Sequence, residues 1–174
     1  MTKIERQRPK EQDKNIRRSN FEAVENNLLP DQARLEASRC LNCKNPRCVQ
    51  GCPVNINIPG FIQKVKEGDI EGAGEIIRQT SMLPSVCGRV CPQERQCEGN
   101  CVLGIKGESV AIGALERFVG DNSKAKDPTI KSSGKKVAIV GSGCAGMTAA
   151  CDLRKAGHDV TVFEALHKLG GVLR

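Results

Sequence analysis

The stretches RCLNCKNPRCVQGCP (residues 39–53) and CGRVCPQERQCEGNC (residues 87–101) decide the fold of this chain. Together they hold eight of the ten cysteines in a chain of 174 residues. In the first run two, four and three residues separate successive cysteines, and in the second run three, five and three. Thiols at this density must either bind a group between them or pair with one another.

The composition is ordinary for a soluble protein, with 39% hydrophobic and 27% charged residues, but aromatic residues are limited to 4 Phe. Small domains that cannot bury enough apolar surface commonly depend on metals or disulfides. The first twenty residues contain no apolar run typical of a secretory signal or a membrane span. We therefore expect a cytoplasmic protein, in which thiols stay reduced and disulfides are disfavoured.

The chain is basic, with a formal net charge of +7. Much of this charge lies in residues 1–20, which could be a nucleic-acid arm, a docking tail for an acidic partner, or a solvated and partly disordered tail. Charges of both signs are mixed there rather than forming a block, and no aromatic residue is available to stack on bases. We favour the solvated tail, and expect neither nucleic acid nor a membrane as a partner.

Residues 21–121 are expected to form a helical domain. Pro30 or Asp31 can begin a helix that leads to Cys40, because proline is well tolerated at the first helical position. A second helix begins at Pro59 and ends at Gly68, and Asp69 caps a third. The second and third helices together predict a helical hairpin.

The rest of the chain predicts a loop and a helix, then a linker, and then the start of a second domain. The second cysteine run, interrupted by glycine and proline, is expected to be loop-like, and a helix with Ser109 as a candidate cap should follow it. Residues 122–135 are typical of a linker. Residues 136–174 predict a strand, a helix and a second strand, which is the start of an α/β Rossmann-like domain. Because a third strand is missing, we interpret the chain as a fragment of a longer protein.

An iron-sulfur centre explains the cysteines better than zinc. Zinc sites pair two C-x2-C units or add histidines, whereas only Cys40 and Cys43 have that spacing. The first run ends in C-x3-C-P at Cys52 and Pro53, as in two-cluster ferredoxins, where the last cysteine serves the other cluster. Two clusters close together favour electron transfer over a purely structural role.

The spacing divides the thiols only in part. Cys40, Cys43 and Cys48 would hold one cluster with a fourth ligand from the second run. Cys52 would join the other cluster, whose remaining ligands come from the second run: Cys87, Cys91, Cys97 or Cys101. Which of these four serves the first cluster stays open at this point.

A glycine-rich turn follows the predicted strand near residue 140 and precedes a helix, as in dinucleotide-binding G-x-G-x-x-G turns. The first helical turn supplies free N–H groups for phosphates. Glu164 ends the next strand, where an acid can accept hydrogen bonds from ribose hydroxyls. The turn consists of Gly141, Ser142, Gly143, Cys144, Ala145 and Gly146.

Four segments resemble one known family. RCLNCKNPRCVQGCPVNINIPGFI, LPSVCGRVCPQERQCEGNCVLG, VAIGALERFVGD and GKKVAIVGSGCAGMTAACDLRKAGHDVTVFEALHKLGGVLR are together similar to the N-terminal part of the glutamate synthase small (beta) subunit. The larger subunit of electron-bifurcating transhydrogenases and the start of dihydropyrimidine dehydrogenase have the same arrangement. The resemblance extends from about Phe21 to the end of the chain.

The resemblance implies two 4Fe-4S clusters in a helical domain, followed by an FAD domain into which an NADPH domain is inserted. Electrons would pass from NADPH through FAD and the clusters to a glutamate synthase large subunit, or a similar flavoprotein acceptor, that makes glutamate from glutamine and 2-oxoglutarate. The sequence leaves a related transhydrogenase subunit, or a metal-stabilised interaction module without a redox role, as alternatives.

The resemblance also implies ligand sets. One cluster would be held by Cys40, Cys43, Cys48 and Cys101, and the other by Cys52, Cys91, Cys97 and Glu116. Glu116 displaces Cys87, which spacing alone would have used. Gly170 and Gly171 match a second glycine pair near the FAD pyrophosphate, and Cys144 stands where the family usually has proline.

Overall fold

The computed structural model describes residues 4–125 and 129–174. The chain divides into two compact units, one ending at Ala125 and the other beginning at Lys126. This boundary falls inside the predicted linker of residues 122–135. Residues 1–3 of the expected tail and residues 126–128 of the expected linker lie outside the described residues.

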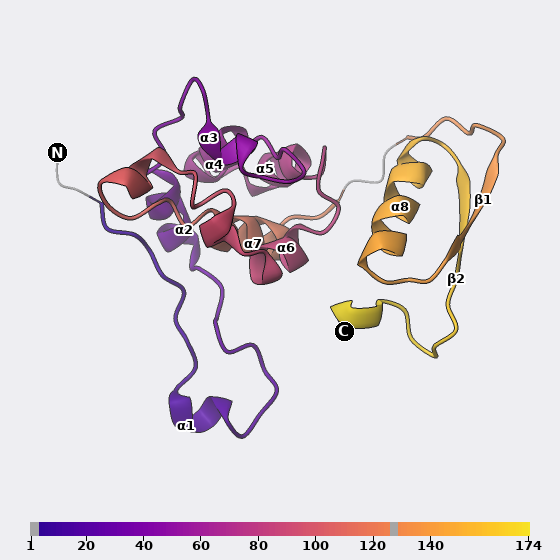
Figure 1. Ribbon diagram of the computed structural model, residues 1–174, viewed down its shortest axis with the longest axis horizontal. Helices are drawn as coiled ribbons and strands as arrows, with labels where there is room; N and C mark the ends of the chain where they lie inside the picture. The colour runs from indigo at the N-terminus through magenta and orange to yellow at the C-terminus, as the bar shows by residue number, and fades with distance from the viewer. Residues whose placement is uncertain (1–3, 126–128) are drawn as a thin grey trace. The chain divides into compact units, whose positions relative to one another are not determined.

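Helices build the first unit (Figure 1). Proline stands in the first turn of three of them, where its missing N–H costs nothing. No helix within the described ranges is long and apolar enough to cross a membrane. In chain order the helices and short 3-10 turns are α1 (Lys14–Arg17), α2 (Pro30–Ala37), α3 (Arg47–Gln50), α4 (Ile58–Glu67), α5 (Ile70–Ile77), α6 (Pro84–Val90), η1 (Gln93–Arg95), η2 (Val102–Ile105) and α7 (Ile112–Asn122).

The predicted helical hairpin is confirmed as α4 and α5. The Asn57 side chain accepts a hydrogen bond from the Gly60 N–H at the start of α4, at 3.1 Å. Gly68 ends α4 with a φ of 84°, a left-handed conformation that glycine adopts without strain. Asp69 then caps α5 by accepting from the Gly72 N–H. The two helices pack together because a single turn joins them.

Helix α7 supplies the centre of the first unit's core. It packs against α2, α4, α5 and α6. Leu115 and Val119 of α7 are fully buried, as are Phe61 and Val65 of α4, and all four belong to one apolar cluster. Burial of this apolar surface is the main favourable contribution to the stability of the unit.

The expectation of a loop for the whole second cysteine run was wrong at its start. Residues 84–90 form α6, which contains Cys87. Pro84 begins this helix, and Gly88 does not break it, because the glycine lies directly against the α7 backbone. A β-carbon at Gly88 would lie 2.5 Å from the Arg117 backbone nitrogen. The missing side chain thus permits close packing of α6 on α7.

The expected cap of α7 was also wrong. The helix begins at Ile112 and its N-cap is Ala111, which has no polar side chain. Ser109 lies before the helix, and its hydroxyl accepts a hydrogen bond from Arg6 at 2.9 Å. The groups that replace a cap are two glutamates from other parts of the chain, Glu36 and Glu98.

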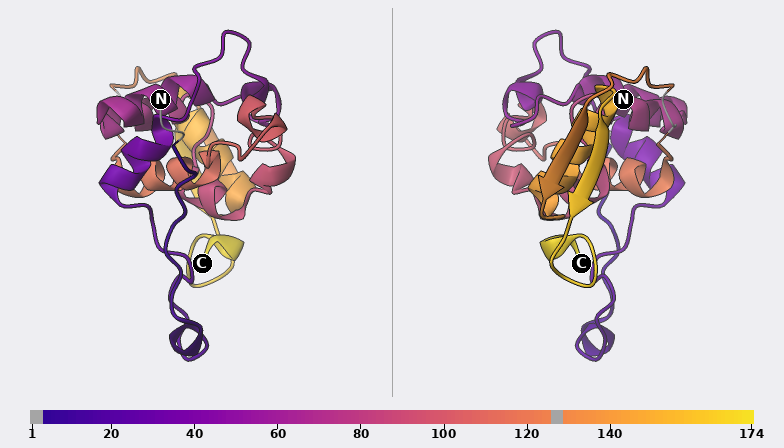
Figure 2. Two further views of the ribbon diagram at one scale, coloured as in Figure 1. Left: turned by 90° about the vertical axis from the view of Figure 1, so that its left-hand side faces the viewer. Right: turned by 90° about the vertical axis from the view of Figure 1, so that its right-hand side faces the viewer.

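The expected solvated tail is instead attached to the helical unit. Gln7 N–H donates to the Glu36 carboxylate at 2.6 Å. Farther along, residues 10–26 double back in an antiparallel hairpin, in which Gln12 N–H donates to the Val24 carbonyl at 2.7 Å. Figures 1 and 2 show this hairpin, with α1 at its tip, extending away from the other helices. The sequence did not predict this attachment, because partners such as Gln7 and Glu36 lie too far apart in the chain to produce a local sequence pattern.

The second unit confirms the predicted strand–helix–strand arrangement. Its elements are β1 (Lys136–Val140), α8 (Cys144–Lys155), β2 (Asp159–Phe163) and the 3-10 turn η3 (Gly171–Leu173). The strands are parallel, with Val137 opposite Val160 and Val140 opposite Phe163, and lie side by side in Figure 2. Parallel strands require a crossover, which α8 supplies.

Replacement of Gly88 by alanine should destabilise the first unit. The added β-carbon would press against the Arg117 backbone, so we expect a loss of about 1–3 kcal/mol in the free energy of unfolding. Denaturant or thermal unfolding measures this loss. The matched control is Gly104→Ala, whose β-carbon would meet its nearest neighbour, the Ser109 β-carbon, at an ordinary 3.7 Å. Equal effects of the two substitutions would contradict the packing described here.

Candidate metal centres and nucleotide site

The first set of thiols lines one pocket of the helical unit. It combines the two cysteine runs, since Cys40, Cys43 and Cys48 share the pocket with Cys101. Apolar side chains form the wall of this pocket: Ile58, Pro59, Ile62, Leu103, Val110 and Ile112. Such a wall keeps water away from a bound cluster, and solvent exposure is one of the factors that set a cluster's reduction potential.

Local backbone geometry brings these thiols together. Helix α2 ends at Ala37, and a turn carries the chain on to Cys40, whose N–H donates to the Ala37 carbonyl at 3.1 Å. Asn42 adopts a φ of 48°, a left-handed conformation that asparagine tolerates and that bends the chain between Cys40 and Cys43. The predicted helix therefore stops short of Cys40, and turns rather than a helix present the first two thiols.

Burial makes two thiols of the first set, Cys40 and Cys48, weaker acids than a free cysteine. It raises the pKa of Cys40, and it raises the pKa of Cys48 to about 11. Nearby Cys101 acts in the same direction on both. Because thiols bind metals as thiolates, loading a cationic group here would release protons.

The second set of thiols gathers around Glu116. Cys52 of the first run is an electrostatic neighbour of Cys87, Cys91 and Cys97 of the second run. Burial is the main cause that raises the pKa of Cys91 and of Cys97 to about 12. The Glu116 carboxylate also raises the pKa of Cys87, Cys91 and Cys97, three of the four thiols of the second run. A cationic group would relieve this concentration of potential negative charge.

Glu116 is a buried acid for which no ion pair is found among the residues that the structure describes. Its exposed fraction is 6%, and its Oε1 has no hydrogen-bond partner among the described residues. Burial raises its pKa to about 7. A carboxylate oxygen left unpaired in the interior costs free energy, and a metal group is one way to offset that cost. The second donor set therefore fits an iron-sulfur cluster with one oxygen ligand.

Cys87 lies in the same neighbourhood and gives the second set a fifth candidate. Its thiol lies about one helical turn before Cys91, and the Ser81 hydroxyl contacts its sulfur at 3.9 Å. Cys87 thus already has a polar partner, whereas the Glu116 Oε1 has none within the described ranges. This difference favours Glu116 as the fourth donor.

The spacing of the donors differs from that of a single-ion site. Among the residues that the structure describes, no three Cys, His, Asp or Glu side chains converge as the ligands of one metal ion do. A 4Fe-4S cluster is a larger group held by four thiolates or their substitutes. The composition of the two donor sets, four thiols in one and thiols with a carboxylate in the other, suits such clusters.

The glycine-rich turn has the backbone that a dinucleotide site requires. Gly141 has a φ of 94°, which allows the tight turn after β1. Gly143 faces open space, so a phosphate could approach its backbone closely. A β-carbon at Gly146 would collide with the Gly141 carbonyl oxygen, which confines that position to glycine. Helix α8 begins at Cys144, so its first N–H groups face this turn.

Ser142 has a role that the motif alone did not indicate. It is fully buried, and its hydroxyl donates to Glu164 Oε2 at 2.5 Å while accepting from the Gly170 N–H at 3.0 Å. The Ser142 N–H donates to the same Glu164 oxygen at 3.0 Å. The hydrogen bonds that Glu164 accepts, from the Ser142 hydroxyl above all and also from the Leu166 and Ser142 N–H groups, hold its pKa down to about 2. Ser142 therefore joins the glycine turn, the end of β2 and the second glycine pair.

The remaining predicted residues of this unit lie around the same turn. Gly170 and Gly171 both have positive φ, and a β-carbon at Gly171 would lie 3.2 Å from the Gly143 Cα. The second glycine pair thus approaches the first glycine turn. Cys144 and Cys151 are half-buried free thiols on α8.

The helical unit matches a known family. Residues 17–128 fit the family described as dihydropyrimidine dehydrogenase domain II, 4Fe-4S cluster. The chain belongs to this family. Residues 139–174 match a second family, the NAD(P)-binding Rossmann-like domain. The expected fold class, a helical iron-sulfur domain followed by the start of an α/β Rossmann-like domain, is therefore confirmed.

Several curated proteins are similar to this chain over most of its length. The glutamate synthase [NADPH] small chain of Escherichia coli K12 is 39% identical over 175 residues, covering 98% of this chain and 37% of that protein. The putative oxidoreductase AegA of the same organism is 39% identical over 163 residues, covering 90% and 25%. The NAD-dependent dihydropyrimidine dehydrogenase subunit PreT of E. coli O157:H7 is 40% identical over 152 residues, covering 84% and 37%. The chain thus spans little more than a third of the length of the glutamate synthase small chain.

The metal-free protein should lose stability as the pH rises toward neutrality. The pKa of Glu116 is raised from 4.5 to about 7 in the folded state, so folding binds its proton more tightly. Its contribution is fully present below pH 4.5 and is lost as the pH rises through about 7. The shift corresponds to about 3 kcal/mol. Unfolding measured from pH 4.5 to 7.5 should show this decline in the wild type, and a much smaller one in Glu116→Gln.

The matched control for this measurement is Glu108→Gln, because the Glu108 side chain is 51% exposed. It should leave the pH dependence of the wild type unchanged. If Glu116→Gln has the same pH dependence as the wild type, the Glu116 carboxyl is not buried as described.

Proposed function

We propose that the chain is the electron-transfer part of an NADPH-dependent flavin and iron-sulfur oxidoreductase, of the glutamate synthase small-subunit type. The division of the cysteines into two sets, each drawn from both runs, carries this proposal. The family match, a 4Fe-4S domain followed by an NAD(P)-binding domain, supports it.

The proposed ligands follow the two sets. Cys101 completes the first cluster, because it shares an apolar pocket with the thiols of the first run. Glu116 completes the second, because its carboxylate interacts electrostatically with Cys91 and Cys97 and its buried Oε1 has no hydrogen-bond partner among the described residues. The full sets are Cys40, Cys43, Cys48 and Cys101 for one 4Fe-4S cluster, and Cys52, Cys91, Cys97 and Glu116 for the other.

The second unit is proposed to hold the adenosine diphosphate part of FAD. The backbone N–H groups that follow Gly141 would bind the pyrophosphate, and Gly143 gives them open access. Glu164 would accept hydrogen bonds from ribose hydroxyls, while Ser142 keeps its carboxylate ionised and oriented. Gly170 and Gly171 would lie near the pyrophosphate, close to the first glycine turn. NADPH is proposed to bind outside residues 136–174, in the domain that the family resemblance implies.

When bound, the clusters supply one-electron carriers between a two-electron flavin and an acceptor. The protein contributes the buried donors and the apolar wall around the first set. The proposed acceptor is a glutamate synthase large subunit, which makes glutamate from glutamine and 2-oxoglutarate, or a similar flavoprotein. All ten cysteines are free thiols, which supports a cytoplasmic location, where thiols stay reduced.

Loss of one first-set thiol should remove one cluster and leave the other. Cys43→Ala takes a ligand from the first pocket only, so anaerobically purified protein should lose about half of its iron. The absorption at about 400 nm that dithionite bleaches should fall in proportion. Cys151→Ala, a half-buried thiol of α8, is the matched control and should keep the wild-type iron content. Unchanged iron in Cys43→Ala would contradict the first ligand set.

The choice between Glu116 and Cys87 has its own test. Glu116→Ala should weaken or remove the second cluster, whereas Cys87→Ala should leave both clusters in place. Iron content and the electron paramagnetic resonance (EPR) spectrum of the reduced protein distinguish the two outcomes. Loss of the second cluster in Cys87→Ala but not in Glu116→Ala would assign Cys87 as the ligand.

A further inference from the structure

A buried glutamate joins two of the segments that carry proposed ligands of the second cluster. Glu98 directly follows Cys97 and is 9% exposed. Its Oε1 accepts from the Gly113 N–H at 3.0 Å, in the first turn of α7. Gly113 lies three residues, almost one helical turn, before Glu116. The Glu98 carboxylate therefore connects the backbone beside Cys97 to the helix that presents Glu116.

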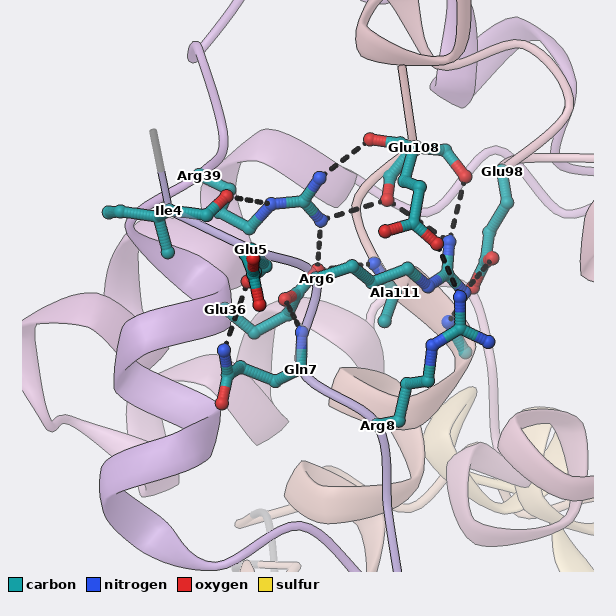
Figure 3. Close-up of polar contacts among 12 residues, drawn as sticks. Ile4, Glu5, Arg6, Gln7, Arg8, Glu36, Arg39, Glu98, Glu108 and Ala111 are labelled. Carbon is teal, nitrogen blue, oxygen red and sulfur yellow. Dashed lines mark hydrogen bonds and ion pairs between the residues drawn. The ribbon is translucent and has the colours of Figure 1, made fainter. Parts of the chain in front are cut away.

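The second oxygen of Glu98 is held by the N-terminal segment. Arg6 Nη2 lies 2.6 Å from Glu98 Oε2, and the side chains of Arg6 and Glu98 are 22% and 10% exposed. Arg6 Nη1 also donates to the Ser109 carbonyl at 3.0 Å and to its hydroxyl at 2.9 Å. Figure 3 shows Arg6 reaching from the N-terminal segment toward Glu98. The guanidinium thus fixes the Glu98 carboxylate from a position outside both cysteine runs.

A second buried glutamate anchors the same segment. Glu36 of α2 is fully buried and accepts from the Gln7 N–H at 2.6 Å and from the Ala111 N–H at 2.8 Å. Its Oε1 also pairs with Arg39 Nη1 at 2.6 Å, as Figure 3 shows. Carboxylates are favourable at a helix N-terminus, where N–H groups lack partners. Glu36 and Glu98 therefore complete the beginning of α7, where the chain itself offers only Ala111 as a cap.

We propose that Glu98, oriented by Arg6, is a positioning residue that sets the place of Glu116 relative to Cys97 in the second cluster. This inference rests on the proposed function, in which both residues are cluster ligands. The arrangement gives the N-terminal segment a specific role, because it stabilises one of the two clusters through a carboxylate that is not itself a ligand. None of the proposed ligands of the first cluster is Cys97 or lies on α7. The first cluster should therefore respond much less than the second to substitution of Glu98 or Arg6.

Burial distinguishes this ion pair from a neighbouring one on the same segment. Arg8 pairs with Glu108, but their side chains are 73% and 51% exposed. Exposed pairs contribute little, whereas removing one partner of a buried pair leaves an uncompensated charge. Arg8→Ala and Glu108→Gln therefore serve as matched controls for Arg6→Ala and Glu98→Gln.

The experiment measures each cluster separately in the anaerobically purified protein. The Cys43→Ala background removes the first cluster, so its EPR spectrum and its rate of iron loss to a chelator report the second. Glu98→Ala should accelerate iron loss from the second cluster at least tenfold and alter its EPR signal. Arg6→Ala should do the same to a smaller extent. Glu98→Gln should partly restore the wild-type rate, because its amide oxygen can still accept from Gly113.

Coupling between the two residues is the most specific result. If Arg6 acts through Glu98, the double variant Arg6→Ala/Glu98→Ala should lose iron no faster than Glu98→Ala alone. In otherwise wild-type protein, the signal of the first cluster should change much less than that of the second in every variant. Should Glu98→Ala not fold, Arg6→Ala and Glu98→Gln decide the question by the same measurements.

Failure of this inference can be told apart from failure of the proposed function. Wild-type protein without two clusters would contradict the proposed function. Two intact wild-type clusters, with Arg6→Ala and Glu98→Gln behaving like Arg8→Ala and Glu108→Gln, would overturn only the positioning role. So would equal effects of Glu98→Ala on both clusters.

Discussion

The helical unit depends on one constraint, which is that polar donors from distant parts of the chain must lie side by side in its interior. Burial raises the pKa of several of these thiols and of Glu116, so these particular groups favour their uncharged forms in the absence of a bound cationic group. The unit meets this constraint by packing α2, α4, α5 and α6 around α7. Helix α7 therefore serves both the apolar core, through Leu115 and Val119, and the second donor set, through Glu116.

Elements with local signals could be predicted from the sequence. Proline in the first turn and the Gly68–Asp69 junction located α4 and α5, and the glycine turn located β1, α8 and β2. Helix α6 was missed because a glycine in the sequence can either break a helix or permit close packing, and the sequence alone does not show that Gly88 packs on α7. The attachment of Arg6 to Glu98 was missed because it joins residues more than ninety positions apart, and ion pairs at that separation leave no periodic pattern.

The assignment of ligands to the two donor sets could also be predicted only in part from the spacing of the cysteines. Spacing indicated two sets but not which thiol crosses between the runs. Resemblance to a known family implied Cys101 and Glu116, and the structure adds the physical circumstances of each: a shared apolar pocket for Cys101 and an unpaired buried oxygen, among the described residues, for Glu116. The role of Ser142 in the nucleotide turn had no signal in the motif, where its position accepts any residue.

Anaerobic analysis of iron and acid-labile sulfide in the purified protein tests the central claim most directly. Two 4Fe-4S clusters require about eight iron and about eight sulfide per chain. Zinc without sulfide in material prepared under the same conditions would contradict the account, and would favour a metal-stabilised interaction module without a redox role.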